Sequence, residues 1–198
     1  MFVTFEGLDG SGKTTQVELL RRHLEESGRE VVVTREPGGT ELGERIRELL
    51  LHGPAMSAWA EATLFAAARA ELVERVIAPA RQRGADVLCD RYVDSSLAYQ
   101  GIARGLGVEP VLELNLAAVQ GLLPDRTFLL LVDPARATAR TGRDPDRIER
   151  EDDAFRVRVD AAYRELSERF PERIVPIDGD GSPEEVADLV RGELQLVS

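Results

Sequence analysis

The sequence predicts an α/β fold in which five parallel strands form one sheet with helices on both faces. Two observations predict it: five short runs are rich in Val, Ile, Leu or Phe, and helical apolar spacing fills the segments between them. Such alternation favours a parallel sheet, whose strands are hydrophobic throughout because both faces are buried. Ligands of these folds bind at the carboxyl ends of the strands, so we expect functional motifs there.

The five runs have the composition of buried β-strands. In chain order they are Phe2–Glu6, Glu30–Thr34, Asp86–Asp90, Phe128–Val132 and Arg173–Ile177. Apolar residues recur at helical spacing after the first run, at Val17, Leu20 and Leu24. The same spacing precedes the third run, at Ala68, Leu72 and Val76. The pattern therefore predicts strands and helices in alternation along the chain.

A helix start follows the fifth run. Ser182 has the N-cap position, Pro183 the first helical position and Glu185 the third, which is the pattern of a capping box. The apolar residues that continue this helix are Leu189, Val190 and Leu194. Neither an internal repeat nor a low-complexity linker interrupts the 198 residues, so we expect one domain over 1–198.

Composition excludes several classes of protein. The formal net charge of -11 argues against a nucleic-acid coat, because such proteins carry a basic face. No apolar run approaches the roughly 18 residues that a membrane helix needs. Cys89 is the single cysteine, and the N-terminus runs straight into a strand without a signal peptide. We therefore expect a cytoplasmic protein without nucleic-acid or membrane partners.

The segment 7–14, GLDGSGKT, fits the phosphate-loop pattern G-x-x-x-x-G-K-[ST] without a mismatch. It follows a predicted strand and opens a predicted helix, which is the context that this motif requires. Its glycines let several backbone N–H groups face phosphate oxygens, and the helix N-terminus adds partial positive charge. The loop is predicted to bind ATP and Mg²⁺ through Gly7, Leu8, Asp9, Gly10, Ser11, Gly12, Lys13, Thr14 and Thr15.

Lys13 is the only lysine among 25 basic residues. A compact ammonium on a flexible stem can bridge the β and γ phosphates, whereas the planar guanidinium of arginine is bulkier and aimed differently. A chain that uses arginine at every other basic position therefore still places lysine here. The hydroxyl of Thr14 is expected to face Mg²⁺.

The third run ends in Asp90, which is followed by Arg91. An aspartate at the end of a buried strand holds Mg²⁺ or its water, or else caps the next helix; the phosphate loop favours the metal. Arg91 suits a second anion in the same cleft, or else a surface salt bridge. A guanine-reading N-K-x-D motif is absent from the sequence, which argues against a GTPase.

Four stretches occur in the order of one known family: GLDGSGKTT at 7–15, REPGGT at 35–40, DRYVDSSLAYQG at 90–101 and DRIE at 146–149. Together they resemble the bacterial type of thymidylate kinase, within the nucleoside monophosphate kinase group, over nearly the whole chain. The resemblance implies a three-layer P-loop fold and a homodimer. It also implies transfer of the γ-phosphoryl group of ATP to dTMP, with Mg²⁺, giving dTDP and ADP.

The resemblance also implies an acceptor site. In this family the counterpart of Phe65 stacks on thymine, that of Arg69 donates to a ring carbonyl, and that of Arg91 holds the acceptor phosphate. The residues implied at the thymine edge, the deoxyribose and the border of the site are Ser96, Gln100, Tyr99, Arg35 and Pro37. Each also has an ordinary interpretation, as core, surface charge, amphipathic helix or structural turn.

A lid is expected from Asp133 to Arg150. Family members without an arginine in the phosphate loop carry a catalytic arginine in the lid, and this loop has none. We expect Arg143 to be that residue, beside Arg136 and Arg147, although a solvated charged loop is the plain alternative. Glu149 is implied as an anchor of the closed lid.

Asp9 is an unusual residue in a phosphate loop, because its carboxylate opposes the phosphates. It is tolerable beside Mg²⁺, a sugar hydroxyl or a cation. The resemblance implies that Asp9 lies between donor and acceptor, and we expect it to be a catalytic group there together with Lys13 and Arg91. A phosphate acceptor is already anionic and needs no general base, whereas Asp9 or Glu36 could serve as the base for a hydroxyl acceptor. The remaining alternatives are an ATPase without an acceptor, an idle nucleotide-binding module, and a kinase for another nucleotide or a deoxynucleoside.

Overall fold

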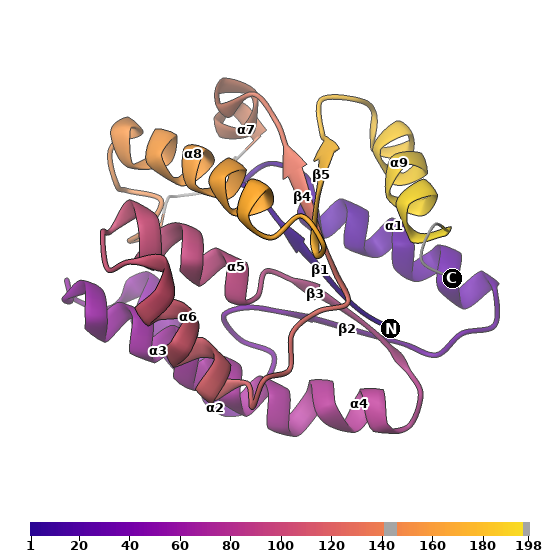
Figure 1. The fold of residues 1–198 in the computed structure, drawn as a ribbon, viewed down its shortest axis with the longest axis horizontal. Coiled ribbons are helices and arrows are strands. Elements are labelled where there is room, and N and C mark those ends of the chain that lie inside the picture. Colours follow the sequence, from indigo (N-terminus) through magenta and orange to yellow (C-terminus); the bar gives the residue numbers. More distant parts are fainter. Residues whose placement is uncertain (141–145, 196–198) are drawn as a thin grey trace.

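The computed structural model describes residues 1–140 and 146–195. Five parallel strands form one sheet in the order β2-β3-β1-β4-β5, with helices on both faces (Figure 1). The predicted fold class is therefore confirmed. The central strand β1 lies between β3 and β4, so the loop that follows it opens at the middle of the carboxyl edge.

The strands are β1 (Phe2–Glu6), β2 (Val31–Arg35), β3 (Asp86–Asp90), β4 (Arg126–Leu131) and β5 (Ile174–Asp178). The sequence-based bounds agree to within two residues. The start of β4 is the largest difference, because Arg126 and Thr127 pair with Val3 and Thr4 of β1 despite being polar. The prediction, which rests on side-chain polarity, therefore starts this strand two residues too late.

Nine α-helical segments lie in the two described ranges: α1 (Lys13–Glu26), α2 (Glu41–His52), α3 (Ala58–Leu72), α4 (Ala78–Gln82), α5 (Val93–Ser96), α6 (Val108–Ala118), α7 (Pro134–Arg140), α8 (Asp153–Arg169) and α9 (Pro183–Gln195). Two π-helical segments, η1 (Val73–Ile77) and η2 (Leu97–Ala103), continue α3 and α5. Helices α1 and α9 pack together on one face of the sheet, and α4 and α8 pack on the other (Figure 1).

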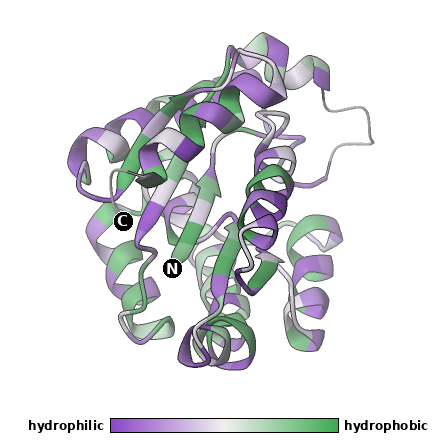
Figure 2. Cartoon of the chain, turned by 90° about the vertical axis from the view of Figure 1, so that its right-hand side faces the viewer, coloured by the Kyte–Doolittle hydropathy of each residue, from purple (hydrophilic) through white to green (hydrophobic). Residues whose placement is uncertain are grey.

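Successive strand residues enter different cores. Phe2, Val87 and Leu129 belong to the larger cluster, whereas Val3 and Leu88 belong to the cluster under α1 and α9. Period-two alternation of side chains on a sheet buried on both faces explains why hydrophobic residues predominate in the strands, which are largely green in Figure 2.

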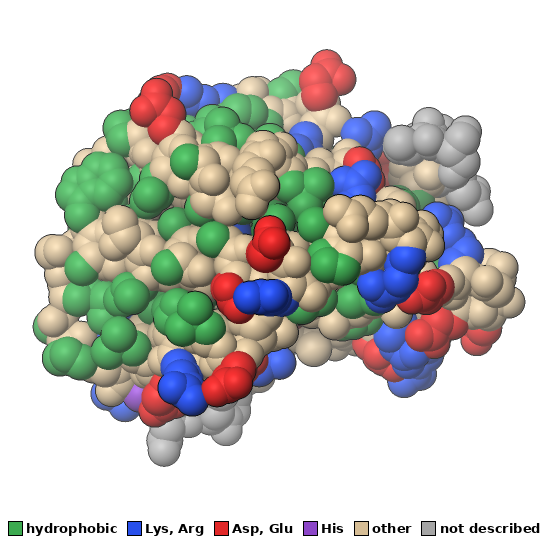
Figure 3. All heavy atoms as spheres, turned by 90° about the horizontal axis from the view of Figure 1, so that it is seen from below, with side chains coloured by type: hydrophobic (Ala, Val, Ile, Leu, Met, Phe, Trp, Pro, Cys, Tyr) green, Lys and Arg blue, Asp and Glu red, His purple; other side chains and the backbone are tan. Residues whose placement is uncertain are grey.

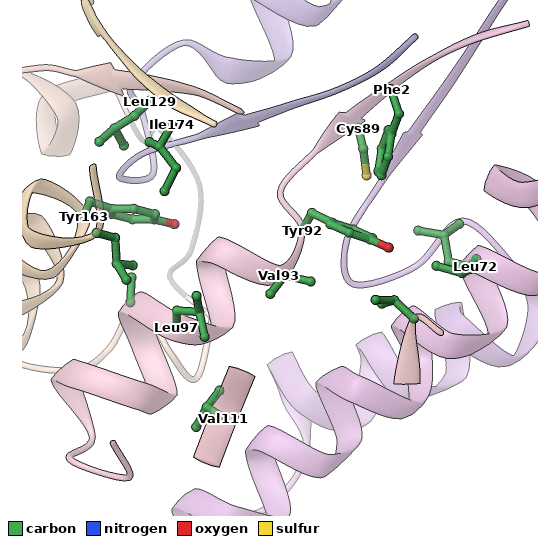
Figure 4. Packing of buried hydrophobic residues seen from close by; sticks show 14 of the residues in the cluster. Phe2, Leu72, Cys89, Tyr92, Val93, Leu97, Val111, Leu129, Tyr163 and Ile174 are labelled. Carbon is green, nitrogen blue, oxygen red and sulfur yellow. The ribbon is translucent and has the colours of Figure 1, made fainter. Parts of the chain in front are cut away.

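The larger cluster anchors the segment that follows β3. The rings of Phe2 and Tyr92 meet edge to face, with centroids 5.1 Å apart, beside Cys89 (Figure 4). The hydroxyl of Tyr92 donates to the carbonyl of Leu122. The buried side chain of Tyr92 therefore holds the start of α5 in place.

The predicted capping box of α9 is confirmed. The backbone N–H of Glu185 donates to Ser182 Oγ over 3.3 Å, and Glu185 Oε2 accepts from the backbone N–H of Ser182 over 2.8 Å. Within the described ranges, the structure has no helix that is both long and apolar enough to cross a membrane.

Candidate active site

A cleft of about 600 Å³ opens at the carboxyl ends of β1, β2 and β3. The phosphate loop, the REPGG turn, α3, η2 and the end of α7 contribute to its walls. Six of the nine predicted loop residues line it, as do all the predicted acceptor-site residues except Arg69. The three loop residues that lie behind its surface are Gly7, Leu8 and Ser11.

The phosphate loop takes its shape from glycine. Gly10 has a φ of 82°, and a Cβ there would lie 2.1 Å from the carbonyl oxygen of Ala137 in α7. Gly7 has a φ of 135°, and its Cβ would lie 2.6 Å from the carbonyl oxygen of Leu130. Both positions therefore exclude a side chain, through backbone conformation and close approach together.

Lys13 lies at the start of α1 with only 6% of its surface exposed. Its Nζ donates to the carbonyl oxygens of Gly7 and Leu8, over 3.1 and 2.9 Å. Burial, and then the nearby charge of Arg91, lower the pKa of Lys13 to about 8. The ammonium therefore lies inside its own loop, where a bound anion would stabilise its positive charge.

Thr14 and Asp90 form the candidate metal site. Thr14 Oγ1 donates to Asp90 Oδ2 over 2.7 Å, which joins the start of α1 to the end of β3. Both atoms are hard oxygen donors, as Mg²⁺ requires, so the residues fit that ion. In the described part of the chain, no group of three or more His, Cys, Asp or Glu could hold a metal.

Arg91 and Asp9 form an ion pair across the floor of the cleft. Arg91 Nη2 donates to Asp9 Oδ1 over 2.7 Å, and Arg91 Nη1 donates to Ser95 and to Tyr163. Burial opposes the charge of Arg91, but Asp9 and other neighbouring groups hold its pKa well above the usual value. Arg91 has a φ of 71°, an uncommon backbone conformation for a residue other than glycine. The carboxylate in the phosphate loop thus has a cation as its partner.

Glu6 is a residue of this site that the sequence reasoning missed. It ends β1 and is fully buried, and its Oε1 accepts from the backbone N–H groups of Tyr92 and Ser95. Its Oε2 accepts from Ser95 Oγ over 2.6 Å and from the hydroxyl of Tyr163 over 2.8 Å. Burial, followed by Asp94, raises the pKa of Glu6. Glu6 therefore holds the turn that presents Arg91.

The structure does not bring Arg69 to the surface of the cleft. Arg69 is 1% exposed, and its guanidinium donates to Glu36, Ser96 and Asn115, and to the carbonyl of Tyr92. It lies under the wall that Ser96 forms. Its expected bond to a thymine carbonyl would require one of these partners to be given up.

Glu36 lines the cleft beside this guanidinium. Its Oε2 accepts from Arg69 Nε over 2.7 Å, whereas its buried Oε1 has no hydrogen-bond partner among the described residues. Burial raises the pKa of Glu36 to about 7, and Arg69 opposes that rise. A carboxyl group on the acceptor side therefore titrates near neutral pH.

The helix that carries Tyr99 and Gln100 has an unusual turn. From Leu97 to Ala103 it is π-helical rather than α-helical, so the 3–4 spacing of Ser96, Tyr99 and Gln100 describes a wider turn. All three still line the cleft. The guanidinium carbon of Arg91 lies 5.5 Å from the centre of the Tyr99 ring. The residue expected to hold the acceptor phosphate and the residue expected beside the sugar are therefore neighbours.

The lid arginines take different positions. Arg140 lines the cleft, Arg136 Nη1 lies 3.4 Å from Asp180 Oδ1, and Arg147 donates to the carbonyl of Leu50 over 2.7 Å. Arg143, the predicted catalytic arginine, lies outside the described residues. Nearby, Glu149 Oε2 accepts from the backbone N–H of Asp146, in the turn that leads to α8.

Comparison with known proteins identifies the family. The family model described as "Thymidylate kinase" matches residues 5–190. The thymidylate kinase of Exiguobacterium sp. is 50% identical over 195 residues, which is 96% of this chain and 92% of the relative. That of Pelotomaculum thermopropionicum is 52% identical over 182 residues, which is 89% of this chain and 84% of the relative.

A solved structure agrees with these sequence matches. The crystal structure of thymidylate kinase from Ehrlichia chaffeensis superposes with a TM-score of 0.81 at 34% identity, and 98% of each chain is covered. With the cleft geometry, these matches confirm the resemblance that the four motifs indicated. The chain belongs to the thymidylate kinase family, whose activity is the ATP-dependent phosphorylation of dTMP to dTDP.

Proposed function

We propose that ATP lies with its phosphates in the loop 7–15 and that dTMP lies across the cleft from it, with Lys13, Asp9, Arg91 and Arg143 as the catalytic groups. One observation carries the proposal. Two cations, Lys13 and Arg91, line one cleft and act on each other electrostatically, and the carboxylate of Asp9 pairs with Arg91. Two neighbouring cations suit two phosphate groups that must approach each other against their own repulsion.

Mg²⁺ is part of the proposal, with Thr14 Oγ1 and Asp90 as the protein groups that hold it; Asp9 is the third candidate. When bound, the ion neutralises charge on the phosphates of ATP. The 2.7 Å bond between Thr14 and Asp90 supports this assignment, because it brings two oxygen donors to the edge of the phosphate loop.

On the acceptor side, Phe65 stacks on the base while Ser96 and Gln100 approach its edge. Tyr99 lies beside the sugar, and Arg91 holds the phosphate. Arg35 and Pro37 border this site, and Arg69 supports it from below through Ser96. The support for these roles is that every one of these residues except Arg69 lines the same cleft.

Transfer itself needs positioning and charge more than covalent chemistry. The phosphate of dTMP is the nucleophile and is already anionic, so no residue is assigned as a general base. Lys13 grips the moving phosphoryl group, and Arg143 from the lid stabilises the charge on its equatorial oxygens once the lid has excluded water. Asp9 keeps Arg91 aimed at the acceptor.

The chain acts as one domain, with a lid at about 133–150, and works in the cytoplasm without nucleic-acid or membrane partners. A homodimer is the proposed assembly. Leu42 and Leu49 of α2 and Trp59 of α3 are large exposed hydrophobic side chains. Hydrophobic side chains also gather on the face of the molecule that Figure 3 shows. Light scattering on the purified protein tests the dimer.

The substrate assignment is tested by ADP formation from ATP and Mg²⁺ with separate acceptors. The panel is dTMP, dUMP, dGMP, dCMP, UMP, AMP and thymidine. Strong turnover with dTMP and little with the others supports the acceptor site. Equal turnover with all acceptors, or hydrolysis indifferent to them, would leave the phosphate loop in place and remove the acceptor assignments.

A further inference from the structure

Glu61 in the first turn of α3 is a buried carboxylate that none of the roles above uses. It is 1% exposed. Its Oε1 accepts from Gln100 Nε2 and from Arg104 Nε, each over 2.8 Å. Its Oε2 accepts from Arg104 Nη2 over 3.1 Å and lies 2.7 Å from Arg147 Nη2. One carboxylate thus joins α3, η2 and the carboxyl-terminal part of the lid.

The hydrogen-bond partners of Glu61 stabilise its ionised form. Burial alone would raise its pKa, but the hydrogen bonds from Arg104, Gln100 and Arg147 outweigh burial and hold the pKa below the usual value. Glu61 is therefore an anion at neutral pH. An ionised carboxylate accepts hydrogen bonds and donates none.

This fixes the orientation of the Gln100 amide. The two ends of a glutamine amide have nearly the same shape, so only hydrogen-bond partners decide which end is the oxygen. Glu61 must face the nitrogen, because it has no proton to give to an oxygen. Gln100 lines the cleft as well, so its carbonyl oxygen Oε1 is the end of the amide that is left for a ligand.

We propose that Glu61 is a positioning residue for base selection, which holds the amide of Gln100 so that an acceptor, and not a donor, meets the base edge. The proposal rests on the proposed function in one respect, namely that Gln100 approaches the base. Thymine carries a ring N–H between its two carbonyls, whereas cytosine carries an unprotonated ring nitrogen there. A hydrogen-bond acceptor at that place accepts from the ring N–H of thymine and is repelled by the unprotonated ring nitrogen of cytosine.

The test compares dTMP with 5-methyl-dCMP, two acceptors that share the methyl group and differ only along this edge. The measured quantity is the ratio of their kcat/KM values, in which any general loss of activity cancels. Glu61→Gln lets the amide of Gln100 turn over, because the new side chain can both donate and accept. The ratio is expected to fall at least about tenfold, as one hydrogen bond at a discriminating site allows.

The matched control is Arg104→Met. It removes two hydrogen bonds from the same carboxylate, on a side chain outside the cleft lining, and leaves the contact between Glu61 and Gln100 in place. The ratio is expected to stay within about threefold of the wild type. A fall equal to that of Glu61→Gln would mean that Glu61 acts only as a structural support, and would overturn the proposal.

Gln100→Leu separates this inference from the proposed function. An unchanged ratio in Gln100→Leu would remove Gln100 from the base pocket, and the proposed acceptor site with it. A lowered ratio in Gln100→Leu with an unchanged ratio in Glu61→Gln would overturn the role of Glu61 alone.

If Glu61→Gln does not fold, the double variant Glu61→Gln/Gln100→Glu replaces it. The double change keeps the hydrogen bond and the charge, and again presents only an acceptor to the base. Its ratio is expected within about threefold of the wild type. A ratio as low as that of Gln100→Leu would contradict the proposal.

Discussion

Arg91 Nη2 lies 2.7 Å from Asp9 Oδ1, so the residue after β3 is tied to the phosphate loop after β1. These two strands are neighbours in the sheet, with Phe5 paired to Asp90. The pair explains why a phosphate loop contains a carboxylate. Asp9 neutralises and orients the buried guanidinium of Arg91, whose charge would otherwise act on Lys13 without compensation.

Asp9→Asn is expected to lower kcat/KM for dTMP about tenfold or more, because Arg91 loses its anionic partner. The Mg²⁺ concentration for half-maximal rate should rise less than it does in Asp90→Asn, since Asp9 contacts Arg91 and is a metal candidate only after Thr14 and Asp90. Asp90→Asn is the matched variant and should raise that Mg²⁺ concentration several-fold. Steady-state rates over a Mg²⁺ titration measure both. An equal Mg²⁺ effect in the two variants would make Asp9 a metal ligand.

Lys13→Met is expected to slow phosphoryl transfer by about 10³-fold without destabilising the fold. Its lowered pKa of about 8 means that burial disfavours the ammonium, so removing the charge adds up to about 3 kcal/mol to the free energy of unfolding. Lys13→Arg should also be inactive, because a guanidinium does not fit between the carbonyls of Gly7 and Leu8. Single-turnover rates and thermal unfolding check this. Near-normal transfer in either variant would remove the phosphate-loop argument.

Glu36 should make the stability of the fold fall as pH rises. Its pKa is raised to about 7 by burial, against 4.5 in the unfolded chain, so the native state binds the extra proton between these values. Stability is therefore lost from about pH 4.5 to about pH 7, by up to about 3 kcal/mol. Glu36→Gln, which resembles the protonated form, should lack this component. Urea unfolding of both proteins at pH 5 and pH 8 measures the difference, and a gap that does not change with pH would refute the assignment.

Arg143→Ala is expected to lower kcat more than it raises KM for dTMP, because the arginine acts mainly on the transition state. Arg136→Ala is the control, since Arg136 lies beside Asp180 and outside the cleft lining. It should keep most of the wild-type kcat. If only the KM changes in Arg143→Ala, that arginine binds substrate and does not stabilise transfer.

The strands and the phosphate loop could be predicted because their signals are local. A run such as Phe2–Glu6 has apolar residues on both faces, and the Ser182–Glu185 capping box lies within four residues of sequence. The π-helical turn at Leu97–Ala103 could not be predicted. Its residues have ordinary α-helical spacing, and contacts with α6 and α8 accompany the wider turn.

The supporting glutamates of the site were invisible for a similar reason. Glu6 meets Tyr163 across 157 residues of sequence, and Glu61 meets Gln100 across 39. Next to their own neighbours in sequence, each is an ordinary charged residue at the edge of an element. The family resemblance assigned Arg69 to the base, and its three buried side-chain partners come from elsewhere in the chain. Motifs thus identify the groups that meet substrate, and the fold identifies the groups that hold them.

The central claim is that donor and acceptor phosphates meet between Lys13 and Arg91 in one cleft. It is tested most directly by calorimetric titration with a single molecule that joins adenosine to thymidine through a polyphosphate chain. The account predicts binding at one molecule per chain, much tighter than ATP or dTMP alone, competitive with both, and weakened by Lys13→Met and by Asp9→Asn. Competition with only one of the two nucleotides, or affinity no better than that of ATP, would contradict it.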